Sequence, residues 1–269
     1  MKVLPPPSGE KPSLYLGDCL QIMPDLPAGS IDLILCDLPY GTTSCRWDTV
    51  IPFEDLWQNY NRLLKPNGTI ALFAAQPFTT RLISSNLRNY RYSWVWIKNN
   101  VTGFAFAKSQ PMRKYEDICI FCSPAYRRKD NGANLREPWV YNPQGLKKLD
   151  KPIKDIRRSG AGDFVYKGKG LCDKVYEQQW TGYPHNVLHF YRDKIRYHPT
   201  QKPVALLTYL IRTYTNPHAV VLDNCMGSGS TAVACLEVGN RKFVGIEQDP
   251  YYYQIACNRI ADKSSCLTK

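Results

Sequence analysis

Long hydrophobic runs, internal repeats and low-complexity tracts are all missing from this sequence. No stretch approaches the roughly 20 consecutive apolar residues that would span a bilayer, and segment 1–7 lacks the apolar core of a secretory signal. Apolar residues make up 43% and charged residues 22% of the 269 positions. This balance is ordinary for a globular protein and excludes a collagen, a coiled coil or a mainly disordered chain. We therefore expect a folded protein of one or two domains with no membrane partner.

Acidic residues are scarce relative to basic ones. The chain has 35 Lys and Arg against 23 Asp and Glu, a net charge of +12. Such a field attracts polyanions, above all nucleic acid, although it also serves solubility. Segment 126–197 alone carries 16 basic and 8 acidic residues, and its basic residues alternate with aromatic ones. This mixture suits phosphate contacts and stacking on bases; the alternative is a solvated insertion with a small core of its own.

Ten cysteines are present, but their spacing predicts neither a metal site nor a disulfide framework. Cys119 and Cys122 have no second pair at ligand spacing, and the apolar alternation around them already predicts a strand. His185 and His189 lack the glutamate of a zinc protease motif. We therefore expect no bound metal and reduced, buried thiols, as in a cytoplasmic protein.

Short apolar runs alternate with amphipathic segments of helical length. The expected strands are 14–16, 31–37, 69–73, 93–97, 117–121, 219–223 and 243–247. The expected helices are 53–64, 78–87, 204–214, 230–238 and 251–260. Strands that alternate with helices predict an open, mostly parallel α/β sheet covered on both faces, and segment 125–197 interrupts this alternation.

Segment 219–231 predicts a strand, a tight glycine turn and the start of a helix. Gly227 and Gly229 allow a turn in which backbone N–H groups face a ligand. The helix that begins at Ser230 favours negative charge at its N-terminus. Glu247 ends the next apolar run, where an acid can accept hydrogen bonds from ribose hydroxyls. The pattern therefore indicates a nucleotide-like ligand.

Two details separate this loop from a dinucleotide-binding fingerprint. The third glycine of that fingerprint is absent, which disfavours an NAD oxidoreductase. Asp223, directly before the loop, would repel a pyrophosphate and instead suits a cationic ligand. S-adenosylmethionine carries both an ammonium and a sulfonium group, so it fits this charge.

Segment 31–40 predicts a buried strand that ends in Asp37-Leu38-Pro39-Tyr40. The carboxyl ends of parallel strands are where α/β sheets bind their ligands. This tetrad resembles the Asp-Pro-Pro-Tyr signature of amino-methylating DNA methyltransferases. Leu38 stands in place of the first proline; it keeps the backbone carbonyl expected to act there and lacks the rigidity of the ring.

Four further segments resemble motifs of the same family. They are the adenine-contacting segment 17–20, segment 198–203 that leads into a helix, the cofactor loop 223–231 and the ribose-binding strand end 245–247. With the tetrad first and the cofactor loop last, their order resembles the circularly permuted β group. The resemblance implies a seven-stranded Rossmann-like sheet with 14–16 beside 243–247. It divides the chain into a catalytic part at 1–124, a target-recognition insertion at 125–197 and a cofactor-binding part at 198–269.

The resemblance also implies a role for each matching residue. Asp37 and the Leu38 carbonyl would accept the two N–H groups of an amine, while Pro39 stiffens the turn and Tyr40 stacks on the base. The implied cofactor-binding residues are Asp18, Cys19, Asp37, Thr200, Lys202, Asp223, Cys225, Gly227, Ser228, Gly229, Ser230 and Glu247. For Lys202 the alternative is a solvated lysine at a helix start.

The implied activity is S-adenosylmethionine-dependent methylation of the N6 amine of adenine at specific sites in DNA. The target base would be flipped out of the duplex. Trp47 and Phe104 are candidates to line the base pocket, with ordinary packing as the alternative. Lys108 and Arg113 are candidates for phosphate contacts, with solvated charge as the alternative.

Several alternatives stay open at this point. Cytosine N4 methylation needs the same geometry, but the family's cytosine enzymes usually carry Ser where this chain has Asp37. A catalytically silent DNA-binding homologue and an RNA substrate are two others. The resemblance is compatible with a homodimer, with a restriction–modification pair, and with the cytoplasm of a bacterial or phage-infected cell.

Overall fold

The computed structural model describes residues 12–42, 48–124, 139–156 and 175–267. Contacts divide the chain into two compact units. The first comprises Met1–Asn142 and Asn186–Lys269, and the second comprises Pro143–His185. No helix within the described ranges is both long and apolar enough to span a membrane.

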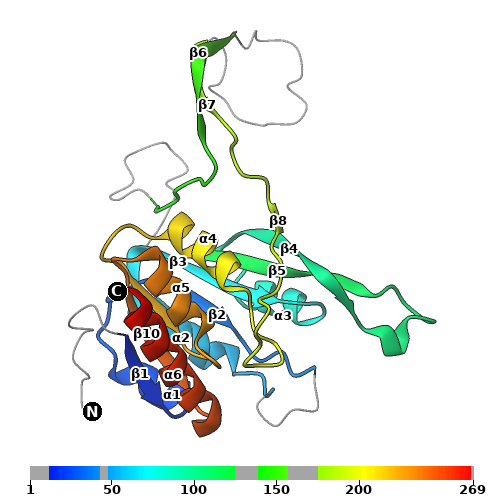
Figure 1. Ribbon diagram of the computed structural model, residues 1–269, viewed down its shortest axis with the longest axis vertical. Coiled ribbons are helices and arrows are strands. Elements are labelled where there is room, and N and C mark those ends of the chain that lie inside the picture. Colours follow the sequence, from blue (N-terminus) through cyan, green and yellow to red (C-terminus); the bar gives the residue numbers. More distant parts are fainter. Residues whose placement is uncertain (1–11, 43–47, 125–138, 157–174, 268–269) are drawn as a thin grey trace. The chain divides into compact units, whose positions relative to one another are not determined.

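One sheet organises the first unit (Figure 1). Its described strands follow the order β1-β10-β9-β2-β3-β5-β4-β8. Only β5 runs against its neighbours, because it is antiparallel to both β3 and β4 while every other pair is parallel. The strands are β1 (Ser13–Leu16), β2 (Ile31–Asp37), β3 (Leu64–Ala74), β4 (Tyr90–Thr102), β5 (Arg113–Cys122), β8 (Val187–His189), β9 (Val220–Asp223) and β10 (Lys242–Glu247). The expected mostly parallel α/β sheet is confirmed, with eight strands rather than seven in the described part.

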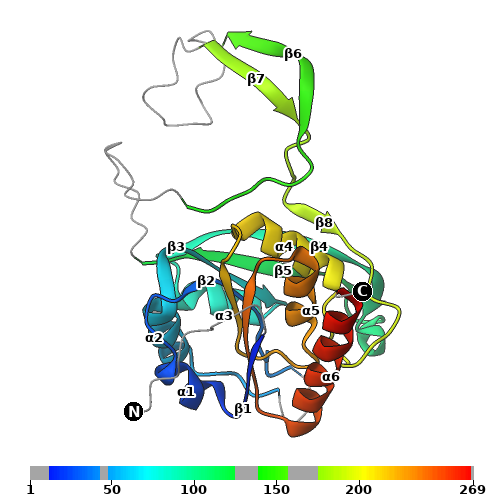
Figure 2. The same cartoon turned by 60° about the vertical axis from the view of Figure 1, so that its left-hand side comes forward.

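Helices cover both faces of this sheet (Figure 2). One core joins α1, α2 and α3 to the sheet, and the other joins α4, α5 and α6 to its opposite face. The alternation along β2 explains the two cores, since Ile34 and Cys36 belong to the first and Leu33 and Leu35 to the second. The helices are α1 (Cys19–Ile22), α2 (Phe53–Leu63), α3 (Phe78–Ser85), α4 (Val204–Tyr214), α5 (Ser230–Val238) and α6 (Pro250–Leu267).

Strands from near the two ends of the sequence, β1 and β10, pair in the sheet. Leu14 of β1 lies opposite Gly245 of β10, and Leu16 lies opposite Glu247. The backbone N–H of Gly17 then donates to the carbonyl of Glu247 at 2.8 Å. The expected pairing of 14–16 with 243–247 is therefore confirmed. This pairing carries the segment after β1 to the carboxyl edge of the sheet.

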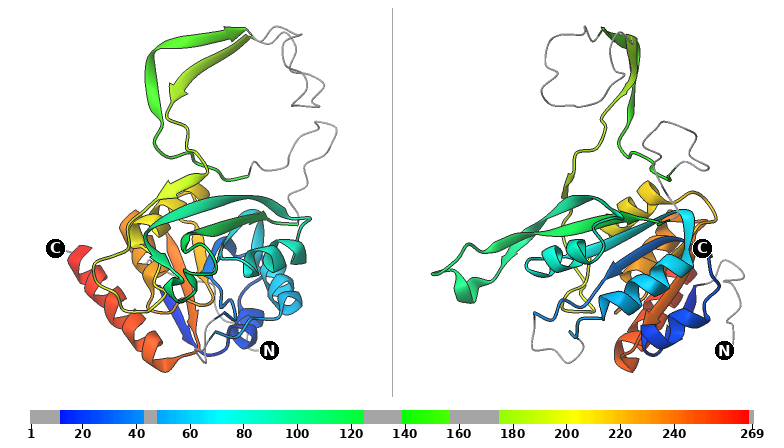
Figure 3. Two further views of the ribbon diagram at one scale, coloured as in Figure 1. Left: turned by 90° about the vertical axis from the view of Figure 1, so that its right-hand side faces the viewer. Right: turned by 180° about the vertical axis from the view of Figure 1, so that it is seen from behind.

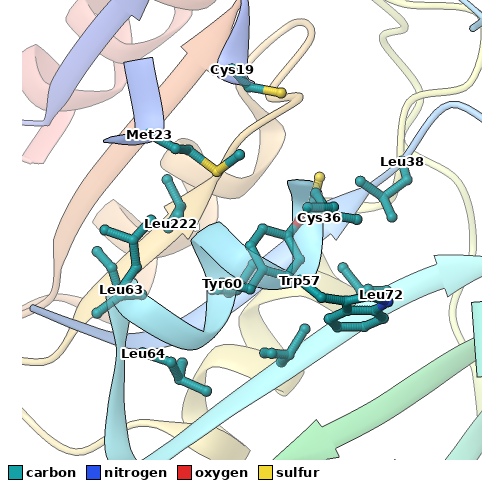
Figure 4. Packing of buried hydrophobic residues seen from close by; sticks show 14 of the residues in the cluster. Cys19, Met23, Cys36, Leu38, Trp57, Tyr60, Leu63, Leu64, Leu72 and Leu222 are labelled. Atoms are coloured by element: carbon teal, nitrogen blue, oxygen red, sulfur yellow. The ribbon is translucent and has the colours of Figure 1, made fainter. Parts of the chain in front are cut away.

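Helix α2 packs on one face of the sheet. Trp57 and Tyr60 point from the helix toward the sheet residues Cys36 and Leu72 (Figure 4). The Tyr60 hydroxyl donates to Asn224 Oδ1 at 2.6 Å, which links the helix to the turn after β9. The buried Tyr60 hydroxyl thus helps to hold that turn in place relative to α2.

Strands β4 and β5 are longer than expected and form an arm that leaves the body of the first unit (Figure 3). The sequence predicted 93–97 and 117–121, whereas pairing continues outward to Thr102 opposite Arg113. A 3-10 turn, Phe104–Phe106, lies in the connection between the two strands. Both phenylalanines are exposed, at 83% and 59%. The outer half of each strand contains polar and charged residues. The prediction relied on apolar runs, so it ended both strands too early.

The second unit contains a two-stranded antiparallel hairpin. It consists of β6 (Lys147–Ile156) and β7 (Val175–Thr181), with Lys147 opposite Thr181. Neither strand was expected from the sequence, because charged residues replace the apolar alternation along β6. Strand β8 was missed for a related reason, since three residues at a sheet edge give too short a pattern.

Candidate active site

A cavity of about 560 Å³ lies at the carboxyl ends of β2, β9 and β10. It brings together the predicted catalytic tetrad and nearly all of the predicted cofactor segments. The predicted residues that line it are Asp18, Cys19, Asp37, Leu38, Pro39, Tyr40, Arg113, Thr200, Lys202, Asp223, Cys225, Gly227, Ser228, Ser230 and Glu247. The cavity therefore joins the beginning and the end of the chain in one site.

Asp37 is the last residue of β2 and stands at the centre of the polar wall. Its Oδ1 accepts the hydroxyl of Tyr40 at 2.9 Å, and its Oδ2 accepts the ammonium of Lys202. The Tyr40 ring stacks on Phe78 of α3, with the ring centroids 4.9 Å apart. Leu38 is buried at 4% exposure and packs into the α2 core. Packing thus holds the turn that proline would otherwise stiffen.

Lys202 connects Asp37 to two residues that the sequence did not single out. Its Nζ lies 3.4 Å from Glu116 Oε2, and Lys98 Nζ lies 3.1 Å from Glu116 Oε1. Lys202 also sits over the ring of Phe73, 5.1 Å from its centroid. All three charged residues line the cavity.

Burial and charge oppose one another in this cluster. Burial raises the pKa of Asp37, and the neighbouring Lys202 only partly reverses that effect. Burial also acts to raise the pKa of Glu116, but the charges of Lys202 and Lys98 outweigh it and lower that pKa. For Lys202, burial acts to lower the pKa, and Asp37 and Glu116 outweigh it and raise that pKa. The pairs therefore keep Lys202 and Glu116 charged inside the protein.

Asp223 and Glu247 both fasten the glycine loop by hydrogen bonds. Asp223 Oδ2 accepts the Thr231 hydroxyl at 2.6 Å, and its Oδ1 accepts the Cys225 N–H at 3.2 Å. Burial raises the pKa of Asp223 to about 7. Glu247 accepts the N–H of Gly227 at 2.8 Å, and burial raises the pKa of this carboxyl also. Both residues line the cavity.

The loop itself needs glycine at two places for different reasons. Gly227 has φ +53° and lines the cavity, so no side chain stands between its backbone and the cavity. Gly229 has φ +77° and does not line it. A Cβ on Gly229 would lie 2.9 Å from the Cβ of Ala256 in α6. Gly229 therefore serves close packing of the loop on α6.

The segment after β1 forms a second wall. Asp18 caps the short helix α1 by accepting the Leu20 N–H at 2.8 Å. The thiols of Cys19 and Cys36 both lie within hydrogen-bonding reach of the Cys225 sulfur. All eight described cysteines are free thiols. Among the described residues, no cluster of three or more His, Cys, Asp or Glu could hold a metal ion.

The segment before α4 closes the remaining side. His198 packs edge-on against the ring of Tyr252, with centroids 4.2 Å apart, and burial lowers its pKa to about 4. Thr200 lines the cavity beside it. Arg259 of α6 donates to the carbonyl of Ser228 at 2.6 Å, which ties the glycine loop to α6.

The four candidates for contacts with the base or with phosphates occupy different positions. Phe104 and Lys108 are in the connection at the end of the arm and do not line the cavity. Arg113 begins β5 and lines the cavity. Trp47 lies outside the described residues. Lys98 and Glu116 were not predicted as site residues. The sequence did offer one signal for them, because each directly adjoins one of the predicted strands, 93–97 and 117–121.

A sequence profile described as DNA methylase, of the N6/N4 methyltransferase family, matches residues 31–258. The putative methylase YubD of Escherichia coli (strain K12) is 48% identical over 255 residues, covering 91% of this chain and 88% of that protein. The chain belongs to this DNA methylase family. The resemblance of the tetrad and of the four accompanying motifs to amino-methylating DNA methyltransferases is therefore confirmed at the level of the family.

Two solved structures share its fold. The M1.HpyAVI–SAM complex matches with a TM-score of 0.58 at 24% identity, covering 93% of this chain and 100% of that one. The cytosine-N4-specific PvuII DNA methyltransferase matches with a TM-score of 0.61 at 16% identity, covering 96% and 95%. At these identities the likeness establishes the Rossmann-like methyltransferase fold of the chain.

Proposed function

We propose that this DNA methylase transfers a methyl group from S-adenosylmethionine to the N6 amine of adenine in DNA. The single observation that carries the proposal is the shared cavity. The Asp37–Tyr40 turn and the glycine loop with Glu247 both line it. A cofactor held by the loop would thus face a base held by the turn.

The residues of the loop side fit S-adenosylmethionine. The buried carboxylate of Asp223 and the half-buried carboxylate of Glu247 suit a ligand with cationic groups and ribose hydroxyls. The loop backbone at Gly227 leaves room for the ligand, because the nearest atom to a Cβ placed there is 3.9 Å away. Asp18 and Cys19 add a wall from the segment after β1. When bound, the cofactor supplies an electrophilic methyl group on its sulfonium.

Asp37 and Leu38 are placed to activate the amine. The lone pair of an exocyclic amine is delocalised into the base, which makes the nitrogen a poor nucleophile. An N–H bond to the Asp37 carboxylate and another to the Leu38 carbonyl would localise that lone pair and stabilise the charge developing on nitrogen. The nitrogen gains the methyl group and loses one proton, which Asp37 is placed to accept. Tyr40 offers its ring to the base.

We assign DNA contacts to the arm and to segment 125–197. A duplex base reaches a cavity of this depth only when it is flipped out. Arg113 and Lys114 at the start of β5 and Lys108 in the connection before it are exposed cations suited to phosphates. The basic hairpin of the second unit suits recognition of a specific target site. These contacts would offset the cost of unstacking the target base.

Incubation of DNA with labelled S-adenosylmethionine, followed by digestion to nucleosides, tests the proposal. We expect label in N6-methyladenine and its loss with Asp37→Ala. Label in N4-methylcytosine would overturn the assignment of adenine. Absence of any label together with tight DNA binding would identify a silent homologue. Persistent methylation by Asp37→Ala would remove the carboxylate from the mechanism.

A further inference from the structure

Four charged side chains form a continuous row behind the catalytic turn. Lys98 of β4 pairs with Glu116 of β5, Glu116 pairs with Lys202, and Lys202 pairs with Asp37 of β2. The side-chain exposures of Lys98, Glu116 and Lys202 are 4%, 14% and 8%. Three strands and the segment before α4 therefore converge to place two lysines and two carboxylates beside the reaction centre.

This row is a poor device for stability alone. Removing charges from water is costly, and well-packed apolar residues often replace a buried ion pair without loss of stability. Within the described residues, Glu116 Oε2 is a buried atom that has an ion-pair contact with Lys202 but no hydrogen bond. A buried acceptor with spare capacity, on a residue that lines the cavity, points to a functional reason for the row.

We propose that Lys98, Glu116 and Lys202 are a positioning array that orients Asp37 and sets the local charge for methyl transfer. This inference rests on the proposed function and adds residues to it. The array touches neither the base nor the methyl group in our assignment, and it acts through Asp37.

The orientation follows from the hydrogen bonds. Lys202 holds Asp37 Oδ2 while the Tyr40 hydroxyl holds Oδ1, so the plane of the carboxylate is fixed from both sides. One donor alone would leave the carboxylate free to rotate about its Cβ–Cγ bond. A fixed plane keeps one lone pair directed at the cavity for an incoming N–H group, which lowers the cost of positioning.

The balance of charge explains why the array extends beyond Lys202. Positive charge develops on the amine nitrogen during the reaction, and a lone ammonium nearby would oppose it. Glu116 offsets Lys202, and Lys98 offsets Glu116 in turn. With Asp37 ionised, the four groups sum to zero. The array thus supplies a hydrogen bond to Asp37 without leaving a net positive charge next to the amine.

Variants of the array should shift the titration of Asp37 in opposite directions. The titratable groups that face Asp37 are Lys202, Glu116, Tyr40, Asp223 and Cys36. Lys202→Met removes a positive neighbour, so we expect a higher pKa for Asp37. Glu116→Gln removes a negative neighbour, so we expect a lower one. Adding Lys98→Met to Glu116→Gln restores the net charge and should bring the pKa back toward wild type.

The first measurement uses the cofactor-free protein and does not depend on activity. The 13C signal of the Asp37 carboxyl, assigned with Asp37→Asn, is titrated in wild type and in each variant by NMR. We expect opposite displacements of about half a pH unit or more. Equal titration curves in wild type, Lys202→Met and Glu116→Gln would overturn the array.

The second measurement is the single-turnover methylation rate as a function of pH at saturating DNA and cofactor. We expect Glu116→Gln to lose about tenfold in rate and Lys202→Met about a hundredfold, with Lys202→Arg recovering part of that loss. The acid limb of the pH–rate profile should shift in the same direction as the Asp37 pKa, upward in Lys202→Met and downward in Glu116→Gln. Lys65→Met is the matched control, because it breaks a 2.7 Å ion pair with Asp32 away from the cavity.

The outcomes separate the two proposals. If the wild-type protein is inactive but the Asp37 pKa still shifts in opposite directions in Lys202→Met and Glu116→Gln, the proposed function is overturned and the array stands. Rates of Glu116→Gln and Lys202→Met that match wild type would overturn the array and leave the proposed function. If either single variant fails to fold, the double variant Lys98→Met/Glu116→Gln decides, and a displaced acid limb in that charge-balanced protein would overturn the array.

Discussion

Asp37, Asp223 and Glu247 are three carboxyl groups whose pKa values burial raises. Asp37 accepts from an ammonium and a hydroxyl, Asp223 from a hydroxyl and a backbone N–H, and Glu247 from backbone N–H groups. Asp37 has an internal cation, whereas Asp223 has none at hydrogen-bonding distance among the described residues. The carboxyl group of Asp223 therefore lacks a positively charged partner, and the proposed cofactor would supply that charge.

Cofactor binding should release protons near neutral pH. Because burial raises the pKa of Asp223 from 3.8 to about 7, this group is largely protonated at pH 6 in the free protein. A cationic ligand favours the ionised form and would lower that pKa. Calorimetric titration of S-adenosylmethionine at pH 6.5, in buffers of different ionisation enthalpy, should show proton release that disappears near pH 8.5. Binding heats that do not depend on the buffer at pH 6.5 would contradict this assignment.

The same group has a predictable effect on stability. Its pKa is higher in the folded than in the unfolded chain, so the folded state binds the proton more tightly. The stabilising contribution is fully present below about pH 4 and is lost as the pH rises through 7. We expect the cofactor-free protein to lose stability over pH 5–8, and Asp223→Asn to flatten that dependence. A denaturant-unfolding series across this range measures the effect, and a slope unchanged in Asp223→Asn would contradict it.

Among the elements, the glycine loop and the arm have contrasting structures. The loop is buried and tied to neighbouring segments by Arg259, Asp223 and Glu247. The arm instead extends the β4–β5 pair away from the sheet and ends in exposed Phe104 and Phe106. Substitutions in the glycine loop should therefore act mainly through packing. Substitutions in the arm should act mainly through the groups that it exposes.

Gly229→Ala should destabilise the protein by about 1–3 kcal/mol beyond its backbone strain, because the new Cβ would collide with Ala256. Gly239→Ala is a matched control, since its φ is +71° and no atom of the described residues lies within 4 Å of a Cβ placed there. Denaturant unfolding of both variants isolates the packing effect. Equal losses of stability in the two variants would refute the close approach of the loop to α6.

Replacing Phe104 and Phe106 with Ala should weaken DNA binding about tenfold without changing cofactor affinity, because stacking on bases contributes on the order of 1–3 kcal/mol per base. Tyr251→Ala is the control, since this side chain is 68% exposed on α6. Fluorescence anisotropy with a labelled duplex measures the affinity. If the double variant binds like Tyr251→Ala, the aromatic tip of the arm has no part in DNA binding.

Charge is unevenly distributed along the chain as a whole. The net charge is +12, and segment 126–197 has twice as many basic as acidic residues. The hairpin strand β6 carries four lysines, at 147, 148, 151 and 154. Such a concentration favours a polyanion over a small uncharged substrate.

The affinity for DNA should fall steeply with salt, and part of that dependence should belong to β6. Replacing its four lysines with Gln should lower the slope of log K against log salt by about 0.9 for each phosphate that the strand no longer neutralises. Affinity should fall to a similar extent on duplexes of any sequence, and cofactor affinity should stay the same. A slope identical to that of wild type would exclude this strand from binding phosphates.

The sequence predicted the architecture well where its signals are local. Helices α4 and α5 have the predicted bounds, and the apolar runs of β2, β9 and β10 are the strands that carry the tetrad, Asp223 and Glu247. The glycine turn and the tetrad are short motifs whose chemistry depends on adjacent residues. The pattern was weaker for β6, β7 and β8, whose strands are polar or very short.

Periodicity and backbone freedom are properties of neighbouring residues, so the amino-acid order alone was enough to predict the alternating sheet, the loop and the turn. Where the long side chains end depends instead on the folded molecule. Lys202 lies in a segment that resembles a cofactor motif, yet its Nζ pairs with Asp37 and Glu116, 165 and 86 positions away in the sequence. Such a pairing follows from how three strands and a loop converge in space, and no local pattern contains that information.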